Sequence, residues 1–497
     1  MTMKKIFVTG VVAASLALTA CDSYLDINEN PQSPSEGNLT TSMIFPVAEM
    51  SFANSYGNYM RITGGYYAQH YAQMFGTSNY IDYSRFQQSA VRSSSTYTNI
   101  ATRCLQNIST VQAMAASGES WGDNLAATVI RVAAYQSMVD CYGEIPYSEA
   151  LDLGNLAPHY DDGKDIYAGL VGELDAALDK VNGSESVCTN FLLPGEKASE
   201  WIKVANALKL RLLMRESNAV DVKASLKALV DENNFPAGDI CWKGCWSNSS
   251  GQANPYYQEE FATYFGSTQQ NVVLNLALLA TMSGADDARL QAYFTPNTVK
   301  GEYTGSVSGS NFSTTANYKA NYWCRPNVKY DDPVYLMTRA EVEFFLAEYE
   351  VRFGDKSKAG AHYEAAIEAS FASAGVSGAE TVINAYPWSE TDYKRCIGIQ
   401  KWVALSGTNN YEAWCEMRRL GYPAMGTVTG AQIYDEQNDA YTPSLLEPGS
   451  LYTPIMFNAQ LGAGKVLQRW PYPESSANRN SNTPEYKGDE VPVFWAE

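Results

Sequence analysis

Three stretches of the sequence carry the side-chain types that bind sugars. A sugar ring offers a flat patch of C–H groups and a rim of hydroxyls, so sugar sites combine aromatic rings with planar amide, carboxylate or guanidinium groups. That mixture occurs in the segments 64–86 and 241–258, and a tryptophan and an arginine stand close together in 321–328. The candidate ligand-binding residues are Asn79, Tyr80, Tyr83, Trp242, Trp246, Trp323 and Arg325.

For each aromatic residue the alternative to ligand contact is packing in the core. Tyr66, Tyr67 and Tyr71 recur at helical spacing, which predicts that they are buried. Trp242 and Trp246 stand in polar sequence with no apolar period to bury them, so ligand contact and packing on the helical body both stay open. Tyr outnumbers Phe and Trp combined, 34 against 17 and 10, which indicates that some Tyr side chains face solvent.

The sequence offers few residues or motifs that are typical of catalysis or metal binding. The three histidines are scattered and never in metal-ligand spacing. No nucleophile elbow, HExxH motif or phosphate loop is present. We therefore expect no catalytic residue, no metal site and no cofactor. Asp161, Asp162 and Asp165 read as a solvated helix start, although a structural calcium ion stays possible there.

The charge balance excludes one class of partner. Acidic residues outnumber basic ones by 54 to 35, which gives a net charge of −19 and a pI near 4.7. Such a surface repels phosphate backbones, so we expect no nucleic-acid binding.

The first residues predict an export signal followed by a lipid anchor. Two lysines precede an apolar run over 6–20, so 1–20 reads as a signal peptide, too short to span a bilayer. Leu18-Thr19-Ala20-Cys21 resembles a bacterial lipobox, in which the cysteine thiol receives diacylglycerol. Acyl chains on Cys21 would hold the protein to a membrane surface. The alternative is a coincidental cysteine after an ordinary signal peptide.

Beyond Cys21 the sequence predicts a tether and then a single domain. Residues 21–37 are polar, acidic and contain two prolines, which suits a flexible tether. The acids in it also resemble the signal that sends Bacteroidetes lipoproteins to the cell surface. Residues 38–497 hold no other apolar run long enough to cross a membrane, and we treat them as one domain.

Eight further cysteines leave the disulfide pattern open. Export allows them to oxidise, and the suggestive spacing is that of Cys241 and Cys245, in a short glycine-containing loop. A local disulfide and free buried thiols are both compatible with this pattern. A lone CxxxC without a second pair is not evidence for zinc.

Helical periodicity dominates the rest of the chain. Apolar residues recur at three-and-four spacing after Asn124 through Asp140 and again over 201–217, and the segment 339–375 reads as two helices separated by Gly354-Asp355. Within this hairpin, small and bulky residues fall at offsets typical of a tetratricopeptide repeat, and the first-helix part of the pattern recurs from Trp201. Any helical hairpin also needs small residues where its helices cross.

A different composition separates the helical halves. Residues 241–332 are rich in Gly, Ser, Asn, Thr and aromatics, with one helix-like apolar insert at 272–282, and the last 80 or so residues are rich in proline. We expect both regions to be mostly loop. Long loops in an exported protein usually contribute residues to a binding site.

Five sequence motifs, taken in their order and at their separations along the chain, resemble those of a known protein family. They are DCYGEIPYSEAL at 140–151, ADDARLQAYF at 285–294, PVYLMTRAEVEFFLAE at 333–348, IQKWVALSGTNNYEAWCEMRRLGYP at 399–423 and RWPYP at 469–473. In this order behind a lipobox, they resemble the SusD/RagB family of Bacteroidetes outer-membrane lipoproteins, in particular its second SusD-like branch. We read these motifs as scaffold, with Tyr142-Gly143 ending a helix and Arg418-Arg419 suiting a helix C-terminal dipole.

The resemblance implies a fold and a function. The fold would be all-α, with four tetratricopeptide-like helical hairpins on one side and an irregular, loop-rich ligand-binding face on the other. Members of the family bind glycans, or less often peptides, and close as a lid over a SusC-like TonB-dependent outer-membrane transporter. The ligand contacts of the family lie in no shared motif, so the residues proposed above rest on chemistry alone.

Two other classes compete with this interpretation. Surface lipoproteins include all-α glycoside hydrolases, which need two suitably spaced carboxylates, and 54 acids leave such a pair possible. A purely structural or adhesive lipoprotein would use the helical repeats to bind a partner. We expect a surface-exposed, lipid-anchored binding protein of the outer membrane that is not an enzyme.

Overall fold

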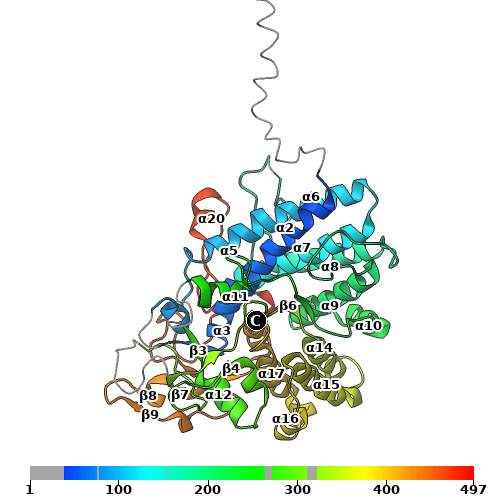
Figure 1. Ribbon diagram of the computed structural model, residues 1–497. Helices are drawn as coiled ribbons and strands as arrows, with labels where there is room; N and C mark the ends of the chain where they lie inside the picture. Colours follow the sequence, from blue (N-terminus) through cyan, green and yellow to red (C-terminus); the bar gives the residue numbers. More distant parts are fainter. Residues whose placement is uncertain (1–38, 75–77, 153, 264–270, 311–321, 497) are drawn as a thin grey trace, which may run out of the picture.

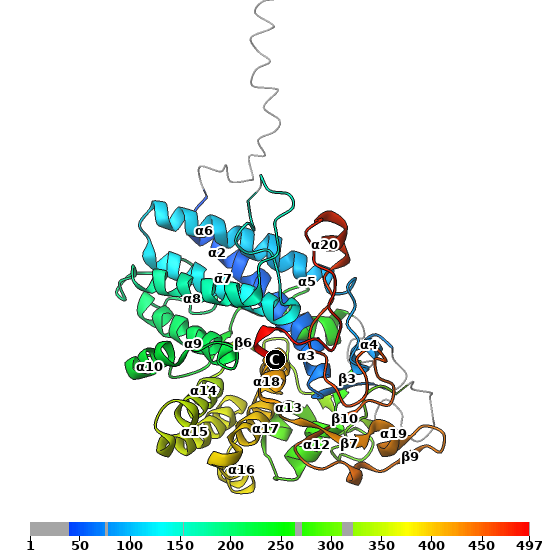
Figure 2. The ribbon, with the colours of Figure 1, turned by 180° about the vertical axis from the view of Figure 1, so that it is seen from behind.

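The structure is a computed structural model that describes residues 39–74, 78–152, 154–263, 271–310 and 322–496. Paired helices fill one side of the molecule, and short strands and loops fill the other (Figures 1 and 2). The four main helix pairs are α6 (Gln106–Ser117) with α7 (Trp121–Tyr142), α8 (Gly163–Leu178) with α9 (Ala198–Glu216), α14 (Arg339–Arg352) with α15 (Lys356–Ala374), and α17 (Tyr393–Leu405) with α18 (Asn410–Leu420). This arrangement confirms the all-α, tetratricopeptide-like fold class.

Shorter helices join these pairs. Two of the connections run through π-helical turns: α2 (Thr41–Ser55) continues through η2 (Tyr56–Met60) into α3 (Arg61–Tyr67), and α5 (Ser94–Thr98) continues through η3 (Asn99–Leu105) into α6. A third π-helical turn, η4 (Gln258–Thr263), follows α11 (Pro255–Tyr257). The other short helices are α4 (Ile81–Ser84), α10 (Lys223–Glu232), α12 (Leu276–Ser283), α13 (Arg289–Tyr293), α16 (Ala379–Ala385), α19 (Gly430–Ile433) and α20 (Glu474–Arg479).

The strands in the described residues form two-stranded sheets on the loop-rich side. The antiparallel pairs are β1 (Tyr71–Gln73) with β3 (Val272–Leu274), β2 (Ile240–Trp242) with β6 (Val334–Met337), β4 (Phe294–Thr295) with β5 (Arg325–Pro326), and β8 (Tyr434–Asp435) with β9 (Ala440–Tyr441). The parallel pair is β7 (Ala424–Thr429) with β10 (Ser450–Thr453). Apart from the local β8–β9 hairpin, these pairs connect segments separated by more than 20 residues, so tertiary pairing holds the loop-rich face together.

The predicted helices at 124–140, 201–217 and 339–375 are confirmed as α7, α9 and the α14–α15 hairpin. Asp355 begins α15 by accepting a hydrogen bond from the Ser357 backbone N–H. Ala359, Tyr363 and Ala366, which the repeat pattern singled out, are fully buried, as are Tyr66 and Tyr67.

The expected helix at 272–282 is wrong in its first part. Val272–Leu274 forms strand β3, and the helix α12 begins only at Leu276, where the Asn275 side chain accepts from the Ala277 N–H. The β-branched valines favour an extended backbone, and pairing with β1 provides hydrogen-bond partners for that backbone. The apolar run alone did not distinguish the two structures.

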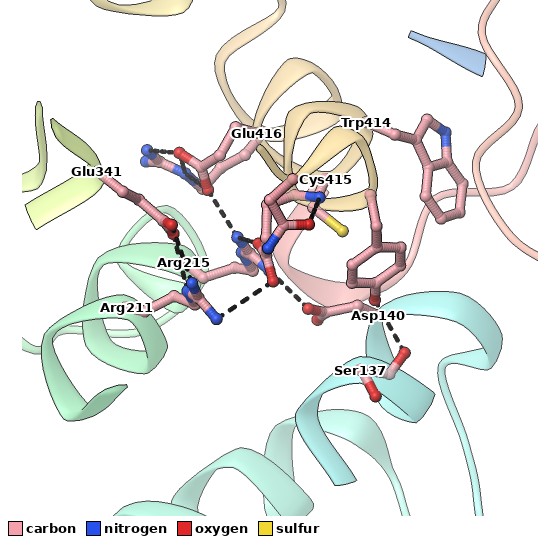
Figure 3. Close-up of polar contacts among 12 residues, drawn as sticks. Ser137, Asp140, Arg211, Arg215, Glu341, Trp414, Cys415 and Glu416 are labelled. Atoms are coloured by element: carbon pink, nitrogen blue, oxygen red, sulfur yellow. Dashed lines mark hydrogen bonds and ion pairs between the residues drawn. The ribbon is translucent and has the colours of Figure 1, made fainter. Parts of the chain in front are cut away.

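A buried ionic network joins the helix pairs (Figure 3). Arg215 of α9 lies at its centre and donates to Asp140 of α7 at 2.6 Å, to Glu412 of α18 and to Glu416 of α18 at 3.0 Å. Neighbouring Arg211 binds Glu341 of α14 through two nitrogens, at 2.8 and 2.9 Å. All of these side chains are essentially inaccessible to solvent.

The network explains the two arginines that end α18. Arg419 is buried and binds Glu348 of α14 through two nitrogens, at 2.7 and 2.6 Å, and it also binds Glu416. Arg418 is buried as well and donates to the backbone carbonyls of Asp140 and Gln468. Both lie in the last helical turn, as the dipole argument expected, but their main partners belong to other elements.

The pKa of Glu416 reflects the cations that surround its carboxylate in the network. Burial raises the pKa of this carboxyl, but Arg419, Lys401 and Arg215 outweigh burial and hold the pKa well below its usual range. Lys401 of α17 approaches the Glu416 carboxylate to 2.9 Å. The network therefore holds charged groups from α7, α9, α14, α17 and α18.

We predict that Arg215→Met destabilises the fold by about 3–5 kcal/mol, the range for removing one partner of a buried ion pair, because Asp140, Glu412 and Glu416 lose their shared cation. Chemical denaturation followed by circular dichroism measures the free energy of unfolding. Lys227→Met is the matched control, since Lys227 and its partner Asp231 are both exposed and that pair should contribute little. Equal losses in the two variants would contradict a structural role for the network.

Candidate ligand-binding site

A cavity of about 500 Å³ is lined by residues of the N-terminal helices and of the segments 79–92 and η4. Its walls come from the α2–η2 helix, the segment 79–92, the α5–η3 helix and η4. The lining residues are Asn54, Ser55, Asn58, Tyr59, Ile62, Asn79, Tyr80, Tyr83, Arg92, Ser95, Thr96, Asn99 and Glu259. We call this space the amide cavity.

All three π-helical turns of the described chain contribute to the amide cavity. Asn58 and Tyr59 come from η2, Asn99 from η3 and Glu259 from η4. A π-helical turn accommodates an extra residue in a helix, redirects the side chains there and has poorer hydrogen-bond geometry, so such turns are frequent at functional sites. Their convergence on one cavity distinguishes it from the other hollows of the structure.

The helix that carries η2 is anchored to the ionic network. The Tyr56 hydroxyl donates to Glu412 at 2.9 Å and accepts from Asn409 at 2.9 Å. Tyr56 is buried, whereas Asn58 and Tyr59, two and three residues later, are half-buried and line the cavity. The turn η2 is thus held by Glu412 and Asn409 through Tyr56, and it lines the cavity through Asn58 and Tyr59.

Aromatic rings form one wall of the cavity. Tyr80 and Tyr83 stack with ring centroids 5.7 Å apart, and Tyr59 meets Tyr83 edge to face at 5.9 Å. The Tyr83 hydroxyl donates to the Tyr59 hydroxyl at 2.9 Å. Tyr80 and Tyr83 are only 5% and 1% exposed, so Tyr59 is the tyrosine of the wall whose ring is most accessible to a ligand.

Polar groups complete the cavity. The exposed Arg92 places its guanidinium 5.6 Å from the centre of the Tyr83 ring and donates to the Asn79 carbonyl. The Tyr80 hydroxyl lies 3.4 Å from Glu259, in position to donate to its carboxylate. Together with the amides of Asn54, Asn58 and Asn99, these groups can donate to and accept from the hydroxyls of a polyhydroxylated ligand.

The structure brings together three of the predicted site residues. Asn79, Tyr80 and Tyr83 all line the amide cavity. Sequence reasoning missed their partners on α2, η2, α5, η3 and η4, because polar residues in a helix usually mark its solvated face. The signal that was present is the pair Asn54 and Asn58, four residues apart and therefore on one face of a helix.

Of the two alternatives left open for Trp242 and Trp246, the structure favours packing on the helical body over ligand contact. Trp242 is fully buried on β2 and packs edge to face against Phe52 of α2 at 6.0 Å. Trp246 is 9% exposed, and its indole N–H donates to the Trp242 carbonyl at 3.2 Å. Pairing of β2 with β6 turns this polar segment onto the helical body, which the lack of local periodicity could not reveal.

Trp323 and Arg325 also lie away from the amide cavity. Trp323 is 2% exposed and packs edge to face against Tyr322 at 5.1 Å and Tyr441 at 5.8 Å. Arg325 is half-buried in β5 and pairs with Thr295 of β4. Neither residue lines the cavity that holds Asn79, Tyr80 and Tyr83.

The eight cysteines of the described residues are all free thiols, so the local disulfide between Cys241 and Cys245 is not formed. Cys241 is held in β2 opposite Tyr335, and Cys245 lies beyond the turn that follows. Within the same residues no cluster of three or more His, Cys, Asp or Glu side chains is suited to a metal ion. Asp162 begins α8 by accepting from the Lys164 N–H, which confirms the helix start predicted there.

Paired helices that support a polar, aromatic cavity define a ligand-binding protein built on a helical-repeat scaffold. The sequence belongs to the SusD-like family of the second branch, described as "Starch-binding associating with outer membrane", which it matches over residues 30–447. The resemblance of the five motifs is thereby confirmed. A search of curated proteins finds no match.

Solved structures share the fold. A SusD homologue from Bacteroides uniformis is 22% identical, with a TM-score of 0.70 over 90% of this chain and 98% of the other. A chitin-binding SusD homologue from Flavobacterium johnsoniae is 19% identical, with a TM-score of 0.70 over 90% and 98% of the two chains. Another protein described as chitin-binding is 20% identical, with a TM-score of 0.71 over 92% and 100%.

Beside Trp242, a buried carboxyl allows a test of this packing. Glu49 of α2 is fully buried, and its Oε1 accepts from the Phe191 backbone N–H at 2.5 Å. Burial raises the pKa of Glu49 to about 8, and the hydrogen bond from the Phe191 backbone and the nearby Trp242 side chain lower it only in part. The folded protein therefore keeps this proton between pH 4.5 and about 8, where the unfolded chain loses it.

We predict that the free energy of unfolding of the wild type falls relative to Glu49→Gln as the pH rises from 4.5 to about 8, and that the difference is constant above this range. The folded state binds one more proton in this window, so the slope is at most about 1.4 kcal/mol per pH unit. Urea denaturation at pH 5, 6, 7 and 8 measures it. Glu232→Gln at an exposed position is the control, and the same pH profile in both variants would refute the assignment.

Proposed function

We propose that this protein is a surface-exposed lipoprotein of the outer membrane that binds glycan nutrients in the amide cavity and passes them to a SusC-like TonB-dependent transporter, for which it acts as a lid. The observation that carries the proposal is the convergence of three π-helical turns on a cavity lined by tyrosine rings, asparagine amides and one arginine. The description of the family as starch-binding supports the ligand class, and two proteins of the same fold are described as chitin-binding.

The composition of the cavity favours binding over hydrolysis. Glycoside hydrolysis by the usual mechanisms needs two carboxyl groups on either side of the scissile bond. Among the described residues that line the amide cavity, Glu259 is the one carboxylate. We therefore propose a binding protein without catalytic activity, and an all-α glycoside hydrolase is the less favoured alternative.

A peptide ligand is the second candidate of the same transporter type. Asparagine amides and Arg92 can bind peptide carbonyls as well as sugar hydroxyls. Stacked and edge-to-face tyrosines at the wall favour the C–H face of a sugar ring. The ligand panel used below includes peptides for this reason.

Membrane attachment completes the proposal. None of the helices in the described part of the chain is long and apolar enough to cross a bilayer. Cys21, the proposed lipidation site, and the proposed tether 21–37 lie outside the described residues, and the first described helix begins at Thr41. The family description associates its members with the outer membrane, which is consistent with an anchor of this kind.

We predict that Arg92→Gln weakens glycan binding by about 1.5–3 kcal/mol, roughly 10- to 150-fold, because one charge-assisted hydrogen bond to a sugar hydroxyl is lost. Isothermal titration against starch, chitin and other oligosaccharides, with peptides in parallel, measures the affinity. Arg103→Gln is the matched control, since Arg103 of η3 is also an exposed arginine but does not line the cavity. If both variants bind like the wild type, the amide cavity is not the site.

We predict that Cys21→Ala releases the protein from the membrane fraction, because the acyl chains are the one membrane anchor that the sequence offers. Detergent phase partitioning and labelling with a radioactive fatty acid measure attachment and acylation. A Cys245→Ala variant, which changes a half-buried thiol in the folded domain, should remain in the membrane fraction. Recovery of acylated Cys21→Ala in the detergent phase would refute the anchor.

A further inference from the structure

Arg61 of α3 is a buried cation without a carboxylate partner. Its side chain belongs to a residue that is 6% exposed, and no carboxylate of the described residues forms an ion pair with it. Its Nε and Nη2 donate only at long distances, 3.3 Å to the Asn410 side chain and 3.4 Å to the Gly407 carbonyl. Nη1 has no hydrogen-bond partner among the described residues.

The other buried arginines of the described chain are compensated. Four of them form close ion pairs with carboxylates, and two are held by backbone carbonyls at 3.0 Å or less. These residues are Arg211, Arg215, Arg289, Arg419, Arg418 and Arg469. Arg61 lacks such partners, and its unpaired Nη1 is not among the fully buried polar atoms, so this nitrogen is available to an anion in the adjoining space.

Arg61 lines a second cavity, of about 260 Å³, which shares no lining residue with the amide cavity. The titratable groups of its lining other than tyrosines are Arg61, Lys329 and Asp332, which sum to one positive charge on a protein of net charge −19. Asp332 accepts from the Lys329 backbone N–H at 2.8 Å and ends the loop at the cavity rim. Lys329 is exposed, so the rim adds a second cation within reach of solvent.

The remaining lining matches a sugar ring. Tyr293 and Tyr335 are half-buried and contribute aromatic surface. The hydroxyls of Ser406 and Thr408 donate to the carbonyls of Val403 and Ala404, which leaves their lone pairs to accept from a ligand. The volume suits one monosaccharide, and the guanidinium is held in place by Asn410 and by the Tyr256 ring, whose centre lies 4.8 Å from it.

We propose that this second cavity, the Arg61 cavity, binds the carboxylate of a hexuronic acid, so that the glycan recognised by this protein carries acidic sugars. The ring would lie against the tyrosines while its carboxylate pairs with Arg61, with Lys329 at the rim. This inference rests on the proposed glycan function for the sugar part of the ligand. The carboxylate part rests on Arg61 alone.

Glucuronate and glucose test the proposal, because they share one pyranose ring and differ in a carboxylate at C6. Saturation-transfer NMR and titration calorimetry on the full folded domain should show glucuronate binding at least tenfold more tightly than glucose. Arg61→Gln should abolish this preference, and Lys329→Gln, at an exposed position, should reduce it severalfold. Arg103→Gln, at an exposed position that lines neither cavity, should leave the preference unchanged.

Three results would overturn the inference. The first is equal binding of glucose and glucuronate by the wild type, and the second is a preference for glucuronate that survives in Arg61→Gln. The third is competition by acetyl-alanyl-alanine as strong as that by glucuronate, which would assign the cavity to a peptide carboxylate. If Arg61→Gln does not fold by its melting curve, Lys329→Gln and a variant of Asn327, which also lines the Arg61 cavity, decide. An unchanged preference in both Lys329→Gln and Asn327→Ala also overturns the inference. If Arg92→Gln loses binding of neutral glycans but keeps the preference for glucuronate, the loss is assigned to the amide cavity, and the preference still supports the Arg61 cavity.

Discussion

The buried ionic network around Arg215 is the interaction on which the rest of the structure depends. Apolar helix faces can slide past one another with small changes in energy, but a guanidinium shared by three carboxylates allows one arrangement of the helices that supply them. Desolvation of these charges is expensive, and good geometry offsets it only when every partner is in place. We infer that the network contributes more to the specificity of helix packing than to net stability.

The network also reaches the ligand-binding side of the molecule. Glu412 binds Arg215 and accepts from Tyr56 of η2, and Asn410, two residues earlier on α18, holds Arg61 of α3. The continuous helix from α2 to α3 is therefore positioned by α18. Because Asn58 and Tyr59 line one cavity and Arg61 lines the other, a single helix sets the geometry of both.

This arrangement separates two kinds of recognition. The amide cavity offers tyrosine rings and neutral hydrogen-bonding groups together with one cation, Arg92, and one carboxylate, Glu259, which suits hydroxyl-rich ligands. The Arg61 cavity is smaller and has a positive lining within an acidic protein. Long-range repulsion from the net charge of −19 would slow the approach of a polyanion, so the positive lining is a local effect that acts at short range.

The sequence by itself determined the features that depend on neighbours a few residues away. Apolar periodicity located α7, α9 and the α14–α15 hairpin, and the mixture of aromatic and amide residues in 64–86 pointed to Asn79, Tyr80 and Tyr83, which line the amide cavity. Only the tertiary structure decided the burial of Trp242, the β3 strand within an apolar run, and the convergence of Tyr59, Arg92 and Glu259. These outcomes depend on pairing between segments up to hundreds of residues apart, whose energies no local pattern contains.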